Sequence, residues 1–200
     1  EDTAHQIAEI IRTKTPHQQA HVVGLSLGAY VVLDLIIHHP DCVTRAIMSG
    51  VTIDPLPNKR LLKIQVPIMS LLMKQTWFIN WQAKMLHIPD EKMTAYIEGM
   101  KQTTRQTFLR VFDELLNYDY RDALSHIQTP TLVVAGELEA PLITSSVYKI
   151  AQMMPHAEGR IAQQVHHGWN IEAPDLFADM LRAWFMCQPL PEALKKTGGV

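Results

Sequence analysis

The stretch HVVGLSLGAYVVLDL, residues 21–35, decides the fold of this chain. It opens on a short apolar run, and residues 29–39 are apolar nearly all round, so a buried strand is predicted to lead into a buried helix. Between them, residues 24–28 read G-x-S-x-G with Ser26 at the centre. At such a turn the serine is held in strained geometry that projects its hydroxyl, and the glycines remove side chains that would clash. The following helix aims backbone N–H groups, including that of Leu27, at any oxyanion formed there.

The segments around this stretch predict an α/β fold with a mostly parallel sheet and helical crossovers. Short apolar runs alternate with helical patterns on both sides of a long interruption. The expected strands are 20–24, 44–49, 131–135 and 160–164, and the expected core helices are 3–14, 29–39, 144–154 and 174–187.

Residues 59–125 break this alternation, because they contain no β-branched run and their Met, Leu, Trp and Phe residues recur at helical intervals. They predict a helical insertion with helices near 59–74, 76–86, 90–101 and 104–117. The expected organisation is an α/β core at 1–57, a helical cap insertion at 58–126, a second part of the core at 127–188, and a loose tail at 189–200.

A serine hydroxyl needs a general base to become a nucleophile, and the base needs an acid that orients it. On a fold of this kind the chain order is serine, acid, histidine. The segment LVVAGELEAPL places Glu137 and Glu139 in the turn after the strand at 131–135. The segment QVHHGWNIEAPDLF places His166 and His167 in the loop after the last strand. Either carboxylate and either imidazole fit these positions.

These three motifs resemble those of the α/β-hydrolase superfamily, specifically its small members with a helical cap. In that resemblance GLSLGAYVVLDL is the nucleophile elbow, TPTLVVAGELEAPL carries the acid at Glu139, and HHGWNIEAPDLF carries the catalytic histidine at His167, five residues before Glu172. The family more often has Asp at the acid position and Gly where this chain has His166. Asp54, after the strand at 44–49, is a second candidate for the acid, since some members place it there.

The resemblance also implies a sheet of eight strands in which the nucleophile follows the fifth. Only one expected helix and one expected strand precede Ser26 here. The loop that supplies the second oxyanion donor in the family is therefore not found, whereas the N–H of Leu27 is retained. We expect the chain to be the C-terminal part of a longer hydrolase, with residues 20–24 forming an exposed apolar edge.

Composition argues against several other classes of function. The chain has 18 Lys and Arg against 20 Asp and Glu, a net charge of −2, which gives no signature for nucleic acid or for a membrane surface. Its ten histidines are scattered without zinc spacing, and no nucleotide-binding glycine motif is found, so neither a metal nor a cofactor is expected. Cys42 and Cys187 are too few for a disulfide scaffold and are expected as buried thiols in a reducing compartment, the cytoplasm, with a single bridge between them as the alternative.

The predicted function is that of a serine hydrolase acting on small, fairly apolar carboxylic esters or related acyl compounds. His167 would take the proton of Ser26, Glu139 would orient the imidazole, and Leu27 N–H would bind the oxyanion. One alternative is a C–C hydrolase, lactonase, acyltransferase or haloperoxidase-type enzyme on the same fold. Another is a non-catalytic ligand-binding protein of hydrolase descent. The expected partner is a small molecule, and the sequence leaves the oligomeric state open.

Overall fold

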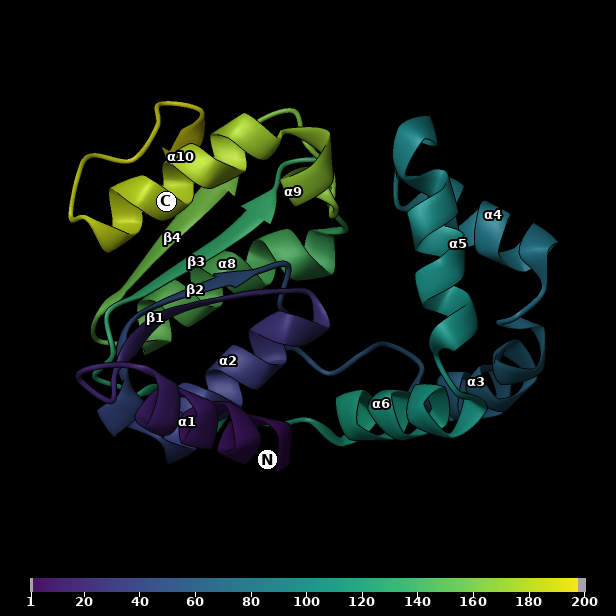
Figure 1. Ribbon diagram of the computed structural model, residues 1–200, viewed down its shortest axis with the longest axis horizontal. Coiled ribbons are helices and arrows are strands. Elements are labelled where there is room, and N and C mark those ends of the chain that lie inside the picture. The colour runs from purple at the N-terminus through teal and green to yellow at the C-terminus, as the bar shows by residue number, and fades with distance from the viewer. Residues whose placement is uncertain (1, 198–200) are drawn as a thin grey trace. The chain divides into compact units, whose positions relative to one another are not determined.

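A mostly parallel sheet of five strands in the order β1-β2-β3-β4-β5 lies at the centre of the part of the chain that carries the motifs (Figure 1). The computed structural model describes residues 2–197. The first four strands are parallel, and β5 pairs antiparallel with β4. The predicted α/β fold with a mostly parallel sheet is confirmed. The strands are β1 (Ala20–Leu25), β2 (Val43–Ser49), β3 (Thr131–Gly136), β4 (Ala157–Ala162) and β5 (Leu194–Lys196).

The expectation of a loose tail at 189–200 is wrong for β5, and residues 198–200 of that range lie outside the described residues. Leu194 is buried in this strand, and its carbonyl oxygen accepts a hydrogen bond from Arg160 Nη1 at 3.0 Å. The three-residue strand therefore covers the outer edge of β4. At the opposite end of the sheet, β1 is an edge strand on which Val23 is 41% exposed, as the sequence predicted for an uncovered apolar edge.

Helices cover both faces of this sheet. In Figure 1, α10 lies over one face, and α2 and α8 lie over the other. Because α2 is apolar on almost every side, it is largely buried against β1, β2 and α1. The helices are α1 (Asp2–Lys14), α2 (Leu27–His38), η1 (Pro40–Cys42), α7 (Arg121–Leu124), α8 (Pro141–Met153), α9 (Trp169–Glu172) and α10 (Pro174–Phe185).

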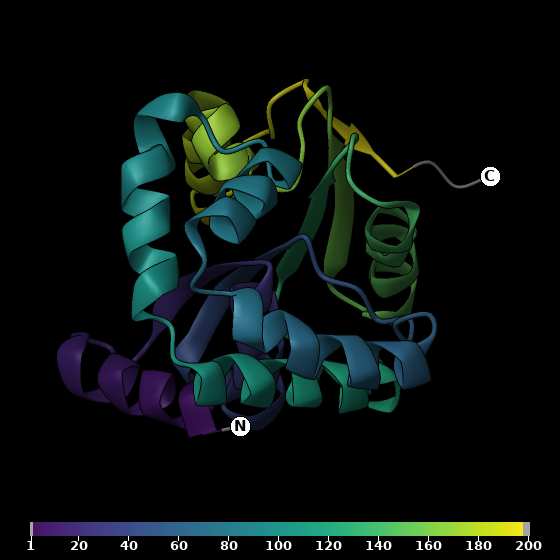
Figure 2. The ribbon, with the colours of Figure 1, turned by 90° about the vertical axis from the view of Figure 1, so that its right-hand side faces the viewer.

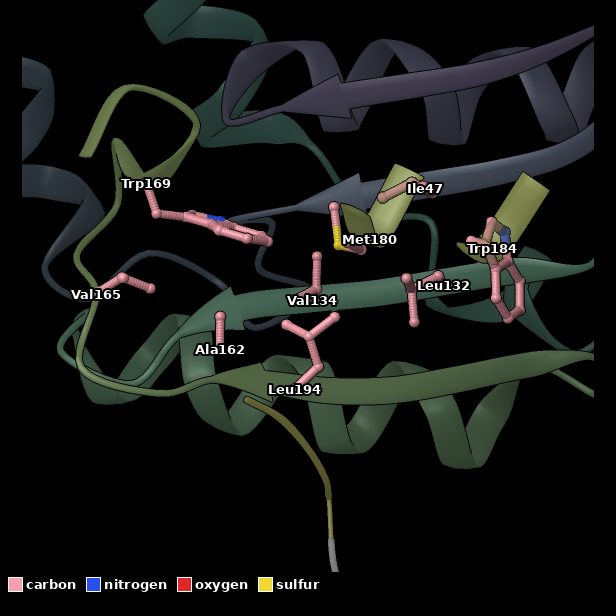
Figure 3. Packing of buried hydrophobic residues seen from close by; sticks show 9 residues of the cluster. All are labelled: Ile47, Leu132, Val134, Ala162, Val165, Trp169, Met180, Trp184 and Leu194. Carbon is pink, nitrogen blue, oxygen red and sulfur yellow. The ribbon is translucent and has the colours of Figure 1, made fainter. Parts of the chain in front are cut away.

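One hydrophobic core lies between the sheet and α10 (Figure 3). Alternate residues of β3 point into it, as the two-residue period of a strand requires. Trp169 is fully buried there and packs edge-on against Phe177, with ring centroids 4.7 Å apart. The cluster contains Ile47, Leu132, Val134, Ala162, Val165, Trp169, Met180, Trp184 and Leu194.

Residues Asp54–Asp119 form a separate unit made of helices. Figure 2 shows α3 beside α6, and these two helices contact each other directly. Val66, Met73, Phe78 and Phe108 make its small core. The elements of this unit are α3 (Lys59–Leu72), α4 (Thr76–Met85), η2 (Asp90–Lys92), α5 (Met93–Gln102) and α6 (Arg105–Asn117).

The boundaries of this unit differ from those expected for the insertion, 58–126. Residues 120–126 belong with the sheet, where Leu124 of α7 is fully buried. None of the helices in the described residues, 2–197, has both the length and the apolar character needed to cross a lipid bilayer.

Candidate active site

Ser26 occupies a sharp turn between β1 and α2. Its backbone has φ 55° and ψ −120°, a conformation that a residue with a side chain rarely adopts. The N–H of Ser26 donates to the carbonyl oxygen of Ser49 at 2.8 Å, which joins the turn to the end of β2. Its own carbonyl oxygen accepts from Ala29 N at 2.9 Å and so begins α2. The turn is therefore fixed on both sides of the serine.

The two glycines of the motif have different roles. A Cβ atom on Gly24 would lie 2.1 Å from the carbonyl oxygen of Gly28, so the close crossing of strand and helix requires glycine at position 24. A Cβ atom on Gly28 would meet nothing within 4 Å among the described residues. The prediction that both glycines avoid clashes is therefore right for Gly24 and wrong for Gly28 in this part of the chain.

Glu139 and His167 form the central pair of the site. His167 Nδ1 lies 2.5 Å from Glu139 Oε2, and the side chain of Glu139 is fully buried. The other carboxylate oxygen, Oε1, accepts from the N–H of Gly136 at 2.8 Å, so the turn after β3 holds the carboxylate in place. Because Nδ1 donates to Glu139, Nε2 is the ring nitrogen that can accept a proton.

Gly50 brings the end of β2 against this pair. It has a φ of +69°, and a Cβ atom there would lie 2.7 Å from Cε1 and 2.9 Å from Nδ1 of His167. Ser49, one residue earlier, is the acceptor for the N–H of Ser26. The ends of β1, β2 and β3 and the loop after β4 thus meet at the carboxyl edge of the sheet, where α/β folds place their sites. The place of Gly50 in the site was not predicted from the sequence, although a glycine directly after a buried strand is a visible signal.

Trp169 is a second residue near the site, and the sequence left open whether it borders a substrate pocket or packs the histidine loop. Its indole Nε1 donates to Ser49 Oγ at 3.0 Å, and both groups are buried. Trp169 lies two residues beyond His167, so this bond ties the histidine loop to the strand that holds the serine turn. It joins residues 120 positions apart in the sequence.

The remaining candidates have other partners. The carboxylate of Glu172 accepts from His166 N at 2.8 Å and lies 3.0 Å from His166 Nδ1, so these two residues brace the histidine loop. Glu137 Oε2 accepts from the N–H of Gln164 at 2.9 Å. Asp54 belongs to the helical unit, whereas the carboxylate bonded to His167 is that of Glu139.

Ser26 and His167 are not hydrogen-bonded to each other within residues 2–197, as is common for catalytic pairs before substrate binds. Leu27, the first residue of α2, is 44% exposed, and the first N–H groups of a helix have no partner within it. Its N–H can therefore donate to an oxyanion formed at Ser26.

The described residues contain no group of three or more His, Cys, Asp or Glu side chains placed to hold a metal ion. Both cysteines are free thiols, and Cys42 is buried as expected, whereas the expectation of a buried thiol is wrong for Cys187, which is exposed.

A mostly parallel sheet with a strained serine turn after one strand, followed along the chain by a bonded Glu and His, is typical of an α/β hydrolase. The sequence profile described as the Alpha/beta hydrolase family matches residues 1–180, and the chain belongs to that family.

The chain is 26% identical to an AB hydrolase superfamily protein of Gibberella zeae, in an alignment that covers 98% of this chain and 66% of that protein. It is 24% identical to RutD of Yersinia enterocolitica, named as a candidate carbamate hydrolase, over 92% of this chain and 69% of RutD. The chain thus spans about two thirds of the length of these relatives. The crystal structure of carboxylesterase CesB from Bacillus subtilis has a similar fold, with a TM-score of 0.77 at 17% identity over 94% of this chain and 67% of CesB.

Proposed function

We propose that this protein is a serine hydrolase that cleaves small, fairly apolar carboxylic esters through Ser26, His167 and Glu139. The observation that carries the proposal is the bond of 2.5 Å between His167 Nδ1 and the buried carboxylate of Glu139, at the same edge of the sheet as the strained turn of Ser26. A base with its orienting acid, beside a projecting serine, is the arrangement that acyl transfer requires.

In the first half of the reaction, Ser26 Oγ attacks the carbonyl carbon while Nε2 of His167 takes the hydroxyl proton. The negative charge moves to the carbonyl oxygen, where the N–H of Leu27 donates to it. When the tetrahedral intermediate collapses, His167 gives the proton to the departing alkoxide. The products of this half are an alcohol and an ester of Ser26.

In the second half, water attacks the acyl-enzyme, and Nε2 of His167 takes one of its protons. Collapse of the second intermediate returns that proton to Ser26 and releases the acid. The carboxylate of Glu139 stabilises the imidazolium that forms twice in each cycle.

A carbamate is a second candidate substrate, because the similarity to RutD favours it. Ser26 Oγ would attack its carbonyl carbon with His167 as the base and Glu139 as the orienting acid. A carbamate resists attack more than an ester does, since its nitrogen donates electrons into the carbonyl group. Cleavage of a carbamate therefore requires more stabilisation of the oxyanion by its N–H donors than cleavage of an ester does.

Labelling by a fluorophosphonate tests the proposal without knowledge of the substrate. The probe forms a covalent bond to an activated serine, and intact mass counts the bonds formed. We expect one label per chain in the unmodified protein and none in Ser26→Ala, with unchanged circular dichroism. Labelling that persists in Ser26→Ala, or an unmodified protein that stays unlabelled, would overturn the proposal. Matched p-nitrophenyl esters and aryl carbamates then separate the two substrate classes.

A further inference from the structure

Large apolar side chains are exposed on two helices of the helical unit. Among the described residues, thirteen large hydrophobic side chains are exposed, and seven of them lie between residues 61 and 85. Their exposed fractions are 51–64%. They are Leu61, Ile64, Ile68 and Leu71 on α3 and Trp77, Trp81 and Met85 on α4, and we call these seven residues the outer stripes.

Each outer stripe follows the period of its helix. On α3 the spacings between successive members are three, four and three residues, and on α4 they are both four, so each stripe lies on one helical face. The core of the unit uses other positions of the same helices, namely Val66 on α3 and Phe78 on α4. None of the seven belongs to that core, although the rings of Trp77 and Trp81 contact the ring of the core residue Phe78, with centroids 5.8 and 5.6 Å apart. Scattered exposed apolar residues need no explanation, but aligned ones do.

The charge of this segment differs from that of the rest of the chain. Residues 55–89 contain five basic residues and no Asp or Glu. The chain as a whole has 18 basic and 20 acidic residues, which leaves 13 basic against 20 acidic elsewhere. The five are Lys59, Arg60, Lys63, Lys74 and Lys84. An anionic surface would therefore attract this segment and repel the remainder of the chain.

Helices with apolar faces, tryptophans and flanking lysines lie in the interface of a membrane rather than across it. The lengths of α3 and α4, 14 and 10 residues, are too short for a span. The expectation of no membrane partner rested on the net charge of the whole chain. That sum does not show that residues 55–89 are basic whereas the rest of the chain is acidic.

We propose that the outer stripes and their five basic residues form a docking surface for an anionic lipid membrane. The apolar side chains enter the boundary between headgroups and acyl chains, and the lysines contact the phosphates. This surface does not depend on the chemistry at Ser26, so Ser26→Ala should bind vesicles as the unmodified protein does.

Vesicle flotation tests the proposal with the whole chain. We expect recovery with vesicles of two parts phosphatidylcholine to one part phosphatidylglycerol, at least about tenfold above recovery with phosphatidylcholine alone, and a marked loss at high salt. Tryptophan emission provides an independent measurement. Trp77 and Trp81 are exposed whereas Trp169 and Trp184 are buried, so only the first two should shift to shorter wavelength on binding.

Paired variants distinguish binding through the outer stripes from nonspecific adsorption to the vesicles. The double variant Ile64→Ser with Ile68→Ser should lose vesicle binding. The double variant Lys63→Glu with Lys74→Glu should weaken vesicle binding, and the loss should be greatest at low salt, where charges are least screened. The matched controls lie outside the helical unit and alter exposed side chains: Met153→Ser with Met186→Ser, and Lys195→Glu with Lys196→Glu. Circular dichroism of each variant checks that it is folded.

Three results would overturn the proposal. The first is no recovery with anionic vesicles, and the second is recovery that the serine variants leave unchanged. The third is a dimer in light scattering that dissociates in Ile64→Ser with Ile68→Ser, because a second copy of the chain would then cover the stripes.

Discussion

The carboxyl edge of the sheet and the apolar faces of α3 and α4 differ in the groups they present, since the first holds hydrogen-bonded polar groups and the second exposes apolar side chains. At the sheet edge both carboxylate oxygens of Glu139 are bonded, and the backbone N–H of Ser26 has an acceptor. On α3 and α4, seven large apolar side chains face outward. The first region holds polar groups rigid, which catalysis requires because geometry determines rate. The second region leaves large apolar side chains exposed. A substitution should therefore have a large effect at the first region and little effect on folding at the second.

The largest expected effect comes from removing the charge of the buried acid. Glu139→Gln keeps an acceptor for Gly136 N–H, but its amide cannot hold His167 in the required tautomer or stabilise the imidazolium. We expect the turnover of a p-nitrophenyl ester to fall by about 10³–10⁴-fold. Asp54→Asn is the control, and its rate should stay within a few-fold of the unmodified protein. A greater loss in Asp54→Asn than in Glu139→Gln would transfer the role of acid to Asp54.

Two tryptophans compare the regions directly. Trp169 is fully buried and Trp81 is 53% exposed, so the same substitution removes a core contact in one case and a surface contact in the other. Trp169→Ala should lower the free energy of unfolding by about 3–5 kcal/mol. Trp81→Ala should lower it by about 0.5–1.5 kcal/mol, because it removes one ring contact with Phe78. Urea unfolding followed by circular dichroism measures both. Equal losses would show that the stripe on α4 supports folding rather than docking.

Two glycines make a finer comparison within the site. A Cβ on Gly50 would collide with the imidazole of His167 from a backbone of φ +69°, whereas a Cβ on Gly28 would meet nothing described. We expect Gly50→Ala to cost about 1–3 kcal/mol of stability and about 100-fold in turnover, because the imidazole must move. Gly28→Ala should leave thermal stability nearly unchanged. The observation that would contradict this reading is a Gly50→Ala protein with full activity.

The sequence was sufficient to predict the parts of the site that local motifs encode. Ser26 follows from a strand, a turn and a helix that are adjacent in the chain, and the family resemblance pointed to Glu139 and His167. It was not sufficient for Trp169, because its partner Ser49 lies 120 residues earlier and nothing in either residue type indicates the pairing. The strand β5 was missed for the same reason, since it exists only by pairing with β4. The outer stripes were visible as helical periodicity, but periodicity alone does not say which face is buried.

The smallest expected effect is on the pH dependence of stability, through the ion pair between Arg12 of α1 and Asp41 of η1. Arg12 donates to both carboxylate oxygens of Asp41, from α1 to η1, at 2.9 and 3.1 Å, and this bond lowers the pKa of Asp41 below its usual value. A carboxyl group with a lowered folded pKa stabilises the fold above its unfolded pKa, and this contribution is lost as the pH falls through the folded pKa.

The melting temperature of Asp41→Asn should therefore lie below that of the unmodified protein at pH 7, and the two should converge as the medium becomes acidic. Because the Asp41 side chain is 65% exposed, solvent screens the pair, and the difference should be no more than a few degrees. Thermal melts of both proteins across the acid range test this. A gap that widens on acidification would contradict the assigned direction of the pKa shift, because only a carboxyl group with a raised folded pKa gives that sign.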